Sequence, residues 1–469
     1  MLLALVSLAQ PAGFTLVDSG VRGQGRAGAF VAGADDISAQ WYNPAALSSM
    51  QGTSVKFDLW ATQQTVEFDR EDILGVNPFN PVESAASPVL EPAGGLVTGL
   101  GGVHKALENT TLAVGVMVPT GSDYAYPADG AQRYAIIDSA IRQLYVGPSV
   151  AQRFTRWLSV GAGLQYTFLH ADQSLVATLC NSADPDACGS DTPTDDVVLD
   201  IAATDPFAMT WNAGVLLTPI PALAIGLSVQ PGVSFAAGGA TTATLSEDNG
   251  TVRPYLTDAS FTDEDATLEV ELPWTVRGGV QVTPVPAVRV ELAGTWTGWS
   301  ATDALVVTDL DLTLTGTEDG PLQGADIVVT DDVSLPTGFV DTWSLRLGGE
   351  WDAHSAVTVR AGEYRETGAT PDGMANPSVP DADKGGAALG LTVRLGPHLS
   401  LDASGMYTAW IDRGVTTSAY AQPALNVDYG DSFRTTVGAG RVIGNGSYRS
   451  SAWVAGLGVG WQFGGRDGR

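Results

Sequence analysis

Basic residues are scarce in this chain. Lysine and arginine together number 23 against 52 aspartates and glutamates, so the formal net charge is −29. An acidic surface can serve solubility alone, but a polyanion would be repelled by it, which excludes nucleic acid as a partner. The acids gather between apolar stretches, at residues 184–196, 258–265 and 303–332. Long acidic loops of this kind fit a protein displayed on a cell surface.

Histidine is rare, and no G-x-S-x-G motif occurs. All four histidines fall near predicted strand ends or turns: His104, His170, His354 and His398. An activated nucleophile needs a histidine or a carboxylate pair within reach, so we expect no enzyme, and an outer-membrane lipid hydrolase is the less favoured alternative. Asp381 and Asp383 lack further oxygen ligands and are interpreted as part of a loop turn. We expect no metal and no cofactor.

The sequence contains only two cysteines, Cys180 and Cys188, within the segment CNSADPDAC. Two cysteines this close together in an exported protein predict a small loop disulfide. A metal site is the weaker alternative, because no histidine lies nearby.

The chain begins with MLLALVSLAQPAGF, and its apolar residues 2–8 are too few to span a bilayer as a helix. An apolar run followed by alanines is typical of the end of a secretory signal. We therefore expect residues 1–12 to be a signal-peptide remnant, cleaved near Ala9 or Ala12.

Lysine and methionine, which favour helices, are few, whereas glycine (56 residues), threonine and valine are common. Apolar residues recur with period 2. One face of the predicted strand at residues 157–170 carries Leu158, Val160, Ala162, Leu164, Tyr166 and Phe168. Similar alternation recurs at residues 343–351, 387–395, 398–410 and 453–463. Such alternation predicts strands with two different faces, but a soluble sandwich shows it too.

Two features favour a membrane barrel over a sandwich. Aromatic residues stand at predicted strand ends, as in the interfacial girdles of such barrels. They are Trp157, Trp211, Trp274, Trp299, Trp343, Trp351, Trp410 and Trp461. Short connections, such as residues 218–223 and 283–288, alternate with long polar ones, such as residues 172–206 and 235–266. Bacterial barrels have short periplasmic turns and long external loops, and counting strands between these connections gives about fourteen.

The uncharged residues 206–246 could be mistaken for two membrane helices. The segment TPIPAL at residues 218–223 would break a helix, and the residues after it alternate, so we predict a hairpin. Residues 14–52 show no alternation and are interpreted as a luminal plug with short helices. The predicted fold is all-β, a transmembrane antiparallel barrel at residues 53–463, with a hatch at 13–52 and a C-terminal extension at 464–469.

Several segments, in order along nearly the whole chain, resemble the outer-membrane long-chain fatty-acid transporter family of the FadL type, which includes importers of aromatic hydrocarbons. They are AGF at residues 12–14, GVRGQGRAGAFVAGADDISAQWYNPAAL at 20–47, VPTGSDY at 118–124, LPWTVRGGVQVTP at 272–284, RAGEY at 360–364 and PDADK at 380–384. The order of these segments is stronger evidence than any one of them.

The resemblance implies a barrel of fourteen strands whose N-terminal hatch rearranges during passage. Asn43, Pro44 and Ala45 would form the hatch motif, and Phe14 would lie near the bound ligand. A kink in the third strand would open the wall sideways, at Gly115, Pro119 and Gly121, where proline cannot donate a ladder hydrogen bond.

The resemblance also implies passive uptake of long-chain fatty acids or similar hydrophobic molecules across the bacterial outer membrane. A general diffusion porin is the main alternative, but it leaves the plug unexplained. The expected surroundings are outer-membrane lipid, lipopolysaccharide and the barrel-assembly machinery, with the protein as a monomer.

Two further patterns in the sequence have both a structural and a functional interpretation. Gly23, Gly25 and Gly28 match a dinucleotide fingerprint, but no apolar strand precedes them, so tight turns are the better interpretation. Charges on predicted luminal faces could bind a carboxylate headgroup, or could form a ladder of ion pairs between neighbouring strands and the hatch. We favour the ion pairs, because opposite signs are interleaved and buried charges need partners. They are Arg289, Glu291, Arg346, Glu350, Arg360 and Arg394.

Overall fold

The structure is a computed structural model. It describes residues 19–50, 52–71, 80–84, 88–102, 107–180, 191, 193–246, 253–258, 260–302, 304–308, 311–319, 324, 326–330, 333–428 and 434–463. The predicted signal remnant, Phe14 and the predicted C-terminal extension lie outside these residues. So do Cys188 and the side chain of Cys180, and with them the predicted disulfide. Among the described helices, none is long and apolar enough to cross a membrane.

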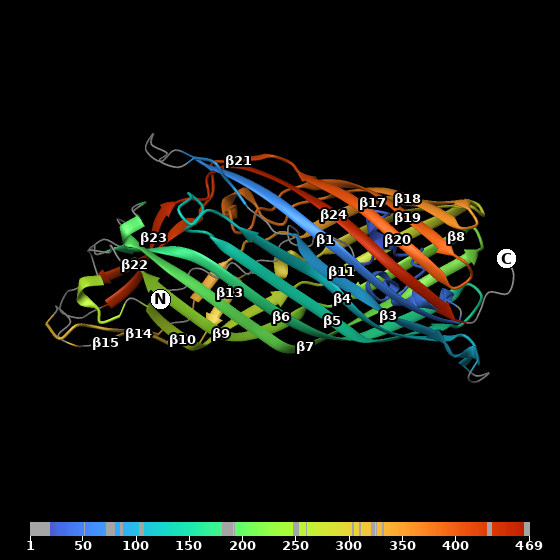
Figure 1. The fold of residues 1–469 in the computed structure, drawn as a ribbon, viewed down its shortest axis with the longest axis horizontal. Coiled ribbons are helices and arrows are strands. Elements are labelled where there is room, and N and C mark those ends of the chain that lie inside the picture. Colours follow the sequence, from blue (N-terminus) through green and yellow to red (C-terminus); the bar gives the residue numbers. More distant parts are fainter. Residues whose placement is uncertain are drawn as a thin grey trace.

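The strands of the described residues close into an antiparallel barrel with 14 strand positions (Figure 1). The first six positions are β1 (Thr53–Arg70), β3 (Val89–Gly99), β4 (Thr110–Ala125), β5 (Asp138–Arg153), β6 (Leu158–Cys180) and β7 (Asp196–Ile220). The last four are β18 (Val357–Glu366), β19 (Lys384–Leu395), β20 (Leu399–Trp410) and β24 (Gly446–Phe463). This confirms the predicted fold class.

Each of the four positions between these groups consists of two strands in line. They are β8 (Leu223–Gln230) with β9 (Val233–Leu245), β11 (Thr275–Val285) with β10 (Ser260–Leu272), β12 (Val288–Thr297) with β13 (Ala304–Thr308), and β17 (Thr342–His354) with β16 (Val333–Pro336). Strands β7 and β8 pair across the turn at residues 221–222, which confirms the hairpin predicted in the uncharged segment.

The barrel closes between its first and last strands. β1 pairs with β24 along its whole length, from Thr53 opposite Phe463 to Arg70 opposite Gly446. This pairing satisfies the backbone groups of both strands, which a strand in hydrocarbon cannot leave unpaired.

Additional strands lie at the end with the long loops. Those that join the barrel sheet are β2 (Val82–Glu83), β21 (Arg413–Val415), β22 (Ala421–Asp428) and β23 (Arg434–Val442), whereas β14 (Asp311–Thr315) and β15 (Asp326–Thr330) form a separate two-stranded sheet. The prediction of long loops at residues 172–206 and 235–266 was wrong in part, because β6, β7, β9 and β10 extend well into these ranges. Their outward faces there carry threonine, alanine and aspartate rather than large apolar residues, which hid the alternation.

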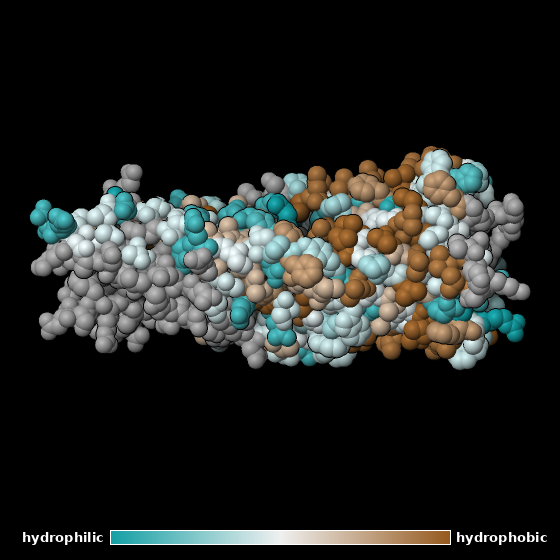
Figure 2. Space-filling view, turned by 90° about the horizontal axis from the view of Figure 1, so that it is seen from below, coloured by the Kyte–Doolittle hydropathy of each residue, from teal (hydrophilic) through white to brown (hydrophobic). Residues whose placement is uncertain are grey.

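The two faces of the barrel wall differ as the alternation predicted. Along β6, Val160 and Leu164 are exposed on the outside, whereas Gly161 and Gln165 are buried on the inside. A hydrophobic band surrounds the half of the barrel at the short-turn end (Figure 2). An apolar band on the outer face of a closed barrel is typical of contact with lipid.

Most of the predicted girdle tryptophans are exposed, but two of them are buried, and for these the girdle prediction was wrong. Trp299 is buried edge-on against Phe339, with 6.1 Å between ring centroids. Trp410 is buried, and the ammonium of Lys384 lies 5.8 Å from its ring centroid. Position at a strand end does not by itself decide which face of the wall a side chain joins.

The described hatch, residues 19–50, lies inside the barrel at the end where β24 finishes (Figure 1). It contains the short helices α1 (Val21–Gln24), α2 (Ala39–Tyr42) and η1 (Pro44–Ser49). Nearly all of its residues are buried, which confirms the prediction of a plug with short helices. Other single-turn helices lie in connections: η2 (Leu100–Gly102), η5 (Pro193–Asp195), η6 (Arg253–Tyr255), η7 (Trp299–Ala301) and η8 (Asp372–Met374).

Candidate transport site

The predicted hatch motif joins the hatch to the barrel wall. The side chain of Asn43 is fully buried, and its Oδ1 accepts a hydrogen bond of 3.1 Å from the backbone N–H of Ala45. Asparagine is a preferred residue at a helix start, and Pro44 takes the first helical position, where its missing N–H costs nothing. Nδ2 of Asn43 donates to the carbonyls of Val31 in the hatch and Val215 in β7, both at 3.1 Å. One side chain therefore caps η1 and ties it to the wall.

Inward-facing glycines of the wall make room for this contact. A Cβ atom at Gly161 would lie 2.4 Å from the carbonyl carbon of Pro44 and 2.5 Å from the nitrogen of Ala45. A Cβ at Gly214 would lie 2.0 Å from Oδ1 of Asn43, and one at Gly226 would lie 2.6 Å from the oxygen of Val31. Any other residue at these positions would collide with the hatch.

The carboxylate of Glu291 in β12 anchors a second part of the hatch. It accepts hydrogen bonds from three consecutive backbone N–H groups, those of Val31 (2.6 Å), Ala32 (2.8 Å) and Gly33 (2.9 Å). It also pairs with Arg26 at 3.1 Å, and neither side chain of this pair has any exposed surface. Hydrogen bonds and an ion pair together offset the large cost of burying a charge.

A third anchor is a network of charges between the hatch, β1 and β20. Arg22 of the hatch donates to Asp402 at 3.1 Å. Lys56 of β1 pairs with Asp36 of the hatch, and with Asp58 and Asp402 at 3.3 Å each. Because Asp402 bridges both cations, the hatch is fixed on the side of the barrel where the first and last strands meet.

The other predicted luminal charges form ion pairs within the wall, as we favoured, although two of the arginines pair with carboxylates outside the predicted set. Glu350 contacts both Arg289 and Arg360, the latter at 3.0 Å. Arg346 pairs with Glu366 at 3.3 Å and donates to the backbone oxygen of Ala27. Arg394 lies 3.9 Å from Asp352. These arginines stiffen the wall and are occupied by protein carboxylates.

The glycines of the dinucleotide-like pattern serve packing and turns. A Cβ atom at Gly23 would overlap the ring of Tyr42, and one at Gly25 would lie 2.8 Å from Cα of Gly390 in β19. Gly28 has a positive φ of 76°, a conformation that other residues rarely adopt. This supports the interpretation as tight hatch turns.

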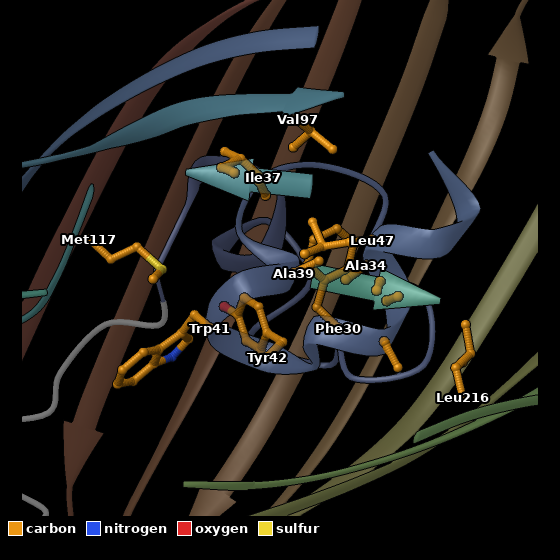
Figure 3. Packing of buried hydrophobic residues seen from close by; sticks show 14 of the residues in the cluster. Phe30, Ala34, Ile37, Ala39, Trp41, Tyr42, Leu47, Val97, Met117 and Leu216 are labelled. Atoms are coloured by element: carbon orange, nitrogen blue, oxygen red, sulfur yellow. The ribbon is translucent and has the colours of Figure 1, made fainter. Parts of the chain in front are cut away.

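An apolar patch lies where the hatch meets the wall beside β3 and β4 (Figure 3). Ile37 and Trp41 of the hatch pack in one cluster with Val97 of β3 and Met117 of β4. The ring of Trp41 lies 5.9 Å from that of Tyr145, and the guanidinium of Arg277 lies 4.6 Å from the Trp41 ring centroid. These side chains are buried against one another, so the patch is an apolar contact between the hatch and this part of the wall.

The pairing between β3 and β4 stops beside this patch. The pairs run from Gly99–Thr111 to Gly94–Val116 and end there. Residues 89–93 of β3 still pair with β1, and β4 beyond Val116 still pairs with β5, but no pairs between these two stretches occur in the described residues. The wall therefore loses its ladder between β3 and β4, and we call this place the wall gap.

The predicted kink residues lie at the wall gap. Gly115 stands in the second-to-last pair, opposite Gly95. Pro119 lies in a bulge, because Val118 and Pro119 together oppose Leu144 of β5, and Gly121 follows opposite Arg142. A bulge bends its strand, and proline cannot donate to a neighbouring strand. The backbone therefore departs from regular pairing where the sequence placed the kink; an opening role for these residues stays a prediction.

At the other end of the barrel, the connection between β4 and β5 folds inward. Arg133 is buried and donates from Nε to Asp196 of β7 at 2.8 Å, and its guanidinium lies 4.2 Å from the ring centroid of Tyr134. The hydroxyl of Tyr134 also donates to Asp196, at 3.0 Å, and burial raises the pKa of Tyr134 above its ordinary value. We call residues 126–137 the inner loop.

The anchoring roles of Arg26, Lys56, Asp58, Glu291 and Asp402 did not follow from the sequence. Alternation predicts which strand residues face the lumen, but it does not predict which of them meets the irregular backbone of the hatch. One pattern in the sequence could have identified the strand residues among them: they are charged residues on strand faces that otherwise carry glycine and serine.

Comparison with known proteins agrees with this geometry. A family model described as "Outer membrane protein transport protein (OMPP1/FadL/TodX)" matches residues 2–463. A solved FadL homologue from Pseudomonas aeruginosa is 19% identical, with a TM-score of 0.73, covering 96% of this chain and all of the other. The toluene transporters TbuX of Ralstonia pickettii and TodX of Pseudomonas putida are 13% and 12% identical. Their TM-scores are 0.60 and 0.63, covering 94% and 93% of this chain and 98% and 97% of theirs. Comparison with curated protein sequences gives no significant match.

Proposed function

Because this chain belongs to the OMPP1/FadL/TodX family of outer-membrane transport proteins, which carry hydrophobic molecules, we propose that its cargo is long-chain fatty acid and that the cargo leaves through the wall gap. The observation that supports this route best is the loss of pairing between β3 and β4 directly beside the apolar patch. Asn43, Pro44 and Ala45 act in this proposal as the hatch motif, and Gly115, Pro119 and Gly121 as the opening.

Movement along this route needs no energy source. Transfer of an alkyl chain from water to apolar surroundings is favourable by about 0.8 kcal/mol per CH₂ group, and the same gain awaits the chain in the bilayer. The wall gap lies between the apolar patch inside the barrel and the hydrocarbon of the bilayer outside. The cargo therefore does not cross water after it enters the barrel.

The hatch stands in the way of the alternative straight path. Its described residues are buried in the lumen and held at three places, by Asn43, by Glu291 and by the Lys56–Asp402 network. A general diffusion porin needs a water-filled lumen, so the buried hatch argues against that alternative. A monomer surrounded by outer-membrane lipid and lipopolysaccharide, inserted by the barrel-assembly machinery, completes the proposal.

Uptake into liposomes tests the cargo class. Liposomes that carry the protein should take up oleate faster than protein-free liposomes, and they should not release a trapped sugar. Free release of the sugar without added oleate uptake would contradict the proposal. Toluene measured in the same preparation decides between a fatty acid and an aromatic hydrocarbon as the better cargo.

A further inference from the structure

A buried carboxyl group stands at the wall gap without a cation. Glu91 lies in β3 among residues 89–93, which have lost their pairing with β4, and only 4% of its surface is exposed. Its neighbours in alternation, Leu90 and Pro92, are exposed on the outside, so the Glu91 side chain faces inward. If the pairing of β3 with β4 continued, Glu91 would stand opposite Pro119.

The contacts of Glu91 are unlike those of the other inward-facing acids of the hatch region. Nε1 of Trp60 donates to Oε2 at 2.6 Å, and Oγ1 of Thr62 donates to the same oxygen at 2.9 Å. Among the described residues no donor reaches Oε1, and no lysine, arginine or histidine forms an ion pair with Glu91. Asp36, Glu291, Glu350 and Asp402, by contrast, each contact a cation.

The surroundings of this carboxyl group are apolar. Trp60 is fully buried and belongs to the same hydrophobic cluster as Ala93, the next inward residue of β3. On the β4 side of the gap, Met117 belongs to the apolar patch. In apolar surroundings charges interact strongly, because little water screens them.

We propose that Glu91 selects the headgroup of the cargo at the wall gap, admitting uncharged headgroups and opposing carboxylate anions. Oε1 can accept a hydrogen bond from a hydroxyl group or from a neutral carboxylic acid. A carboxylate offers Oε1 no donor, and with no cation to balance them the two carboxyl groups cannot both stay charged in apolar surroundings, so a fatty acid and Glu91 together must hold at least one proton. This inference rests on the proposed exit through the gap and adds that a fatty acid passes it as the neutral acid.

The test compares oleate with its uncharged methyl ester in liposomes at one neutral pH. Glu91→Gln keeps the size and one acceptor oxygen but removes the acidic group. Oleate uptake should rise about five- to tenfold, the effect of removing a repulsion of roughly 1 kcal/mol or somewhat more, whereas methyl oleate uptake should stay within about twofold. The control variant is Glu67→Gln, because Glu67 is exposed on the outside of β1 and pairs with Arg449.

The two cargoes separate the possible failures. If wild-type protein transports neither cargo, the proposed function fails. If wild-type protein transports methyl oleate and Glu91→Gln changes neither cargo, or changes both equally, the role of Glu91 in selection is refuted. Only a variant that still takes up methyl oleate is scored, because that uptake shows that its barrel has folded and its exit is open. If Glu91→Gln loses both cargoes through misfolding, Glu91→Ala is measured in its place and scored in the same way.

Discussion

Single side chains hold the hatch in the barrel, and most of them act on its backbone. Asn43 binds two carbonyl oxygens and one N–H group, and Glu291 binds three N–H groups. The irregular hatch cannot satisfy these groups through a ladder or a long helix, so side chains of the wall and of the hatch itself do so. The same contacts can be broken one at a time without unfolding a strand.

Asn43→Ala should loosen the hatch while the barrel stays assembled. The change removes a helix cap and leaves the carbonyls of Val31 and Val215 without this donor, at a cost of about 1–3 kcal/mol. Hydrogen exchange of the amides in residues 19–50 should quicken, whereas that of β1 and β24 should not. Equal exchange in wild type and variant would remove the role of Asn43 in fixing the hatch.

Glu291→Gln should have a larger effect, because it leaves Arg26 buried without a counter-ion. Breaking a buried ion pair on one side costs about 3–5 kcal/mol. The double variant Arg26→Met with Glu291→Gln removes the stranded charge and should recover part of the loss. Hydrogen exchange of Val31, Ala32 and Gly33 measures both effects, and a double variant no better protected than the single one would contradict this account.

At the scale of elements, the positions of the strands were predictable from the sequence. Their lengths and the places where their pairing is irregular were predictable only in part. Period-2 alternation identified β6, β17, β19, β20 and β24, because lipid on one face and small polar groups on the other impose it. Alternation does not report how far a strand extends past the apolar band, which is why the loops after β6 and β9 were overestimated. The family resemblance placed a kink near Pro119, and the bulge there fits a residue that cannot donate to a regular ladder.

The fit of the hatch into β6 rests on the absence of a side chain at Gly161. Gly161→Val should displace η1, because its Cβ would overlap Pro44 and Ala45 at 2.4–2.5 Å. The displaced hatch should raise ion conductance of the barrel in planar bilayers. Gly238→Val in β9 is the matched control, because a Cβ at Gly238 meets nothing within 4 Å. Similar conductance of the two variants would mean that the hatch does not seat against Gly161.

At the scale of the whole molecule, the lumen is narrowed at both ends, by the hatch at one and by the inner loop at the other. The hydrophobic band and the pairing of β1 with β24 were predictable from the sequence, because lipid demands a closed apolar surface. The inner loop was not predictable, since residues 126–137 have the polar, glycine-containing composition of any connection. Its position depends on Arg133 meeting Asp196, 63 residues later.

Arg133→Ala should free the inner loop. The variant leaves the carboxylate of Asp196 without its buried cation, at a cost of about 3 kcal/mol or more if the loop stayed in place. Protease cleavage within residues 126–137 should therefore become faster, while the barrel stays resistant. A cleavage rate equal to that of wild type would show that Arg133 does not hold the loop.

The central claim is that cargo leaves sideways between β3 and β4, and deletion of Pro119 tests it most directly. The deletion removes the extra residue of the bulge, so that β4 can pair in continuous register with β5 and can reach residues 89–93 of β3. Pro119→Ala keeps the length of β4 and serves as the control. We predict that oleate uptake falls to the protein-free rate in the deletion variant and persists in the control. Undiminished uptake by a folded deletion variant would contradict the lateral route.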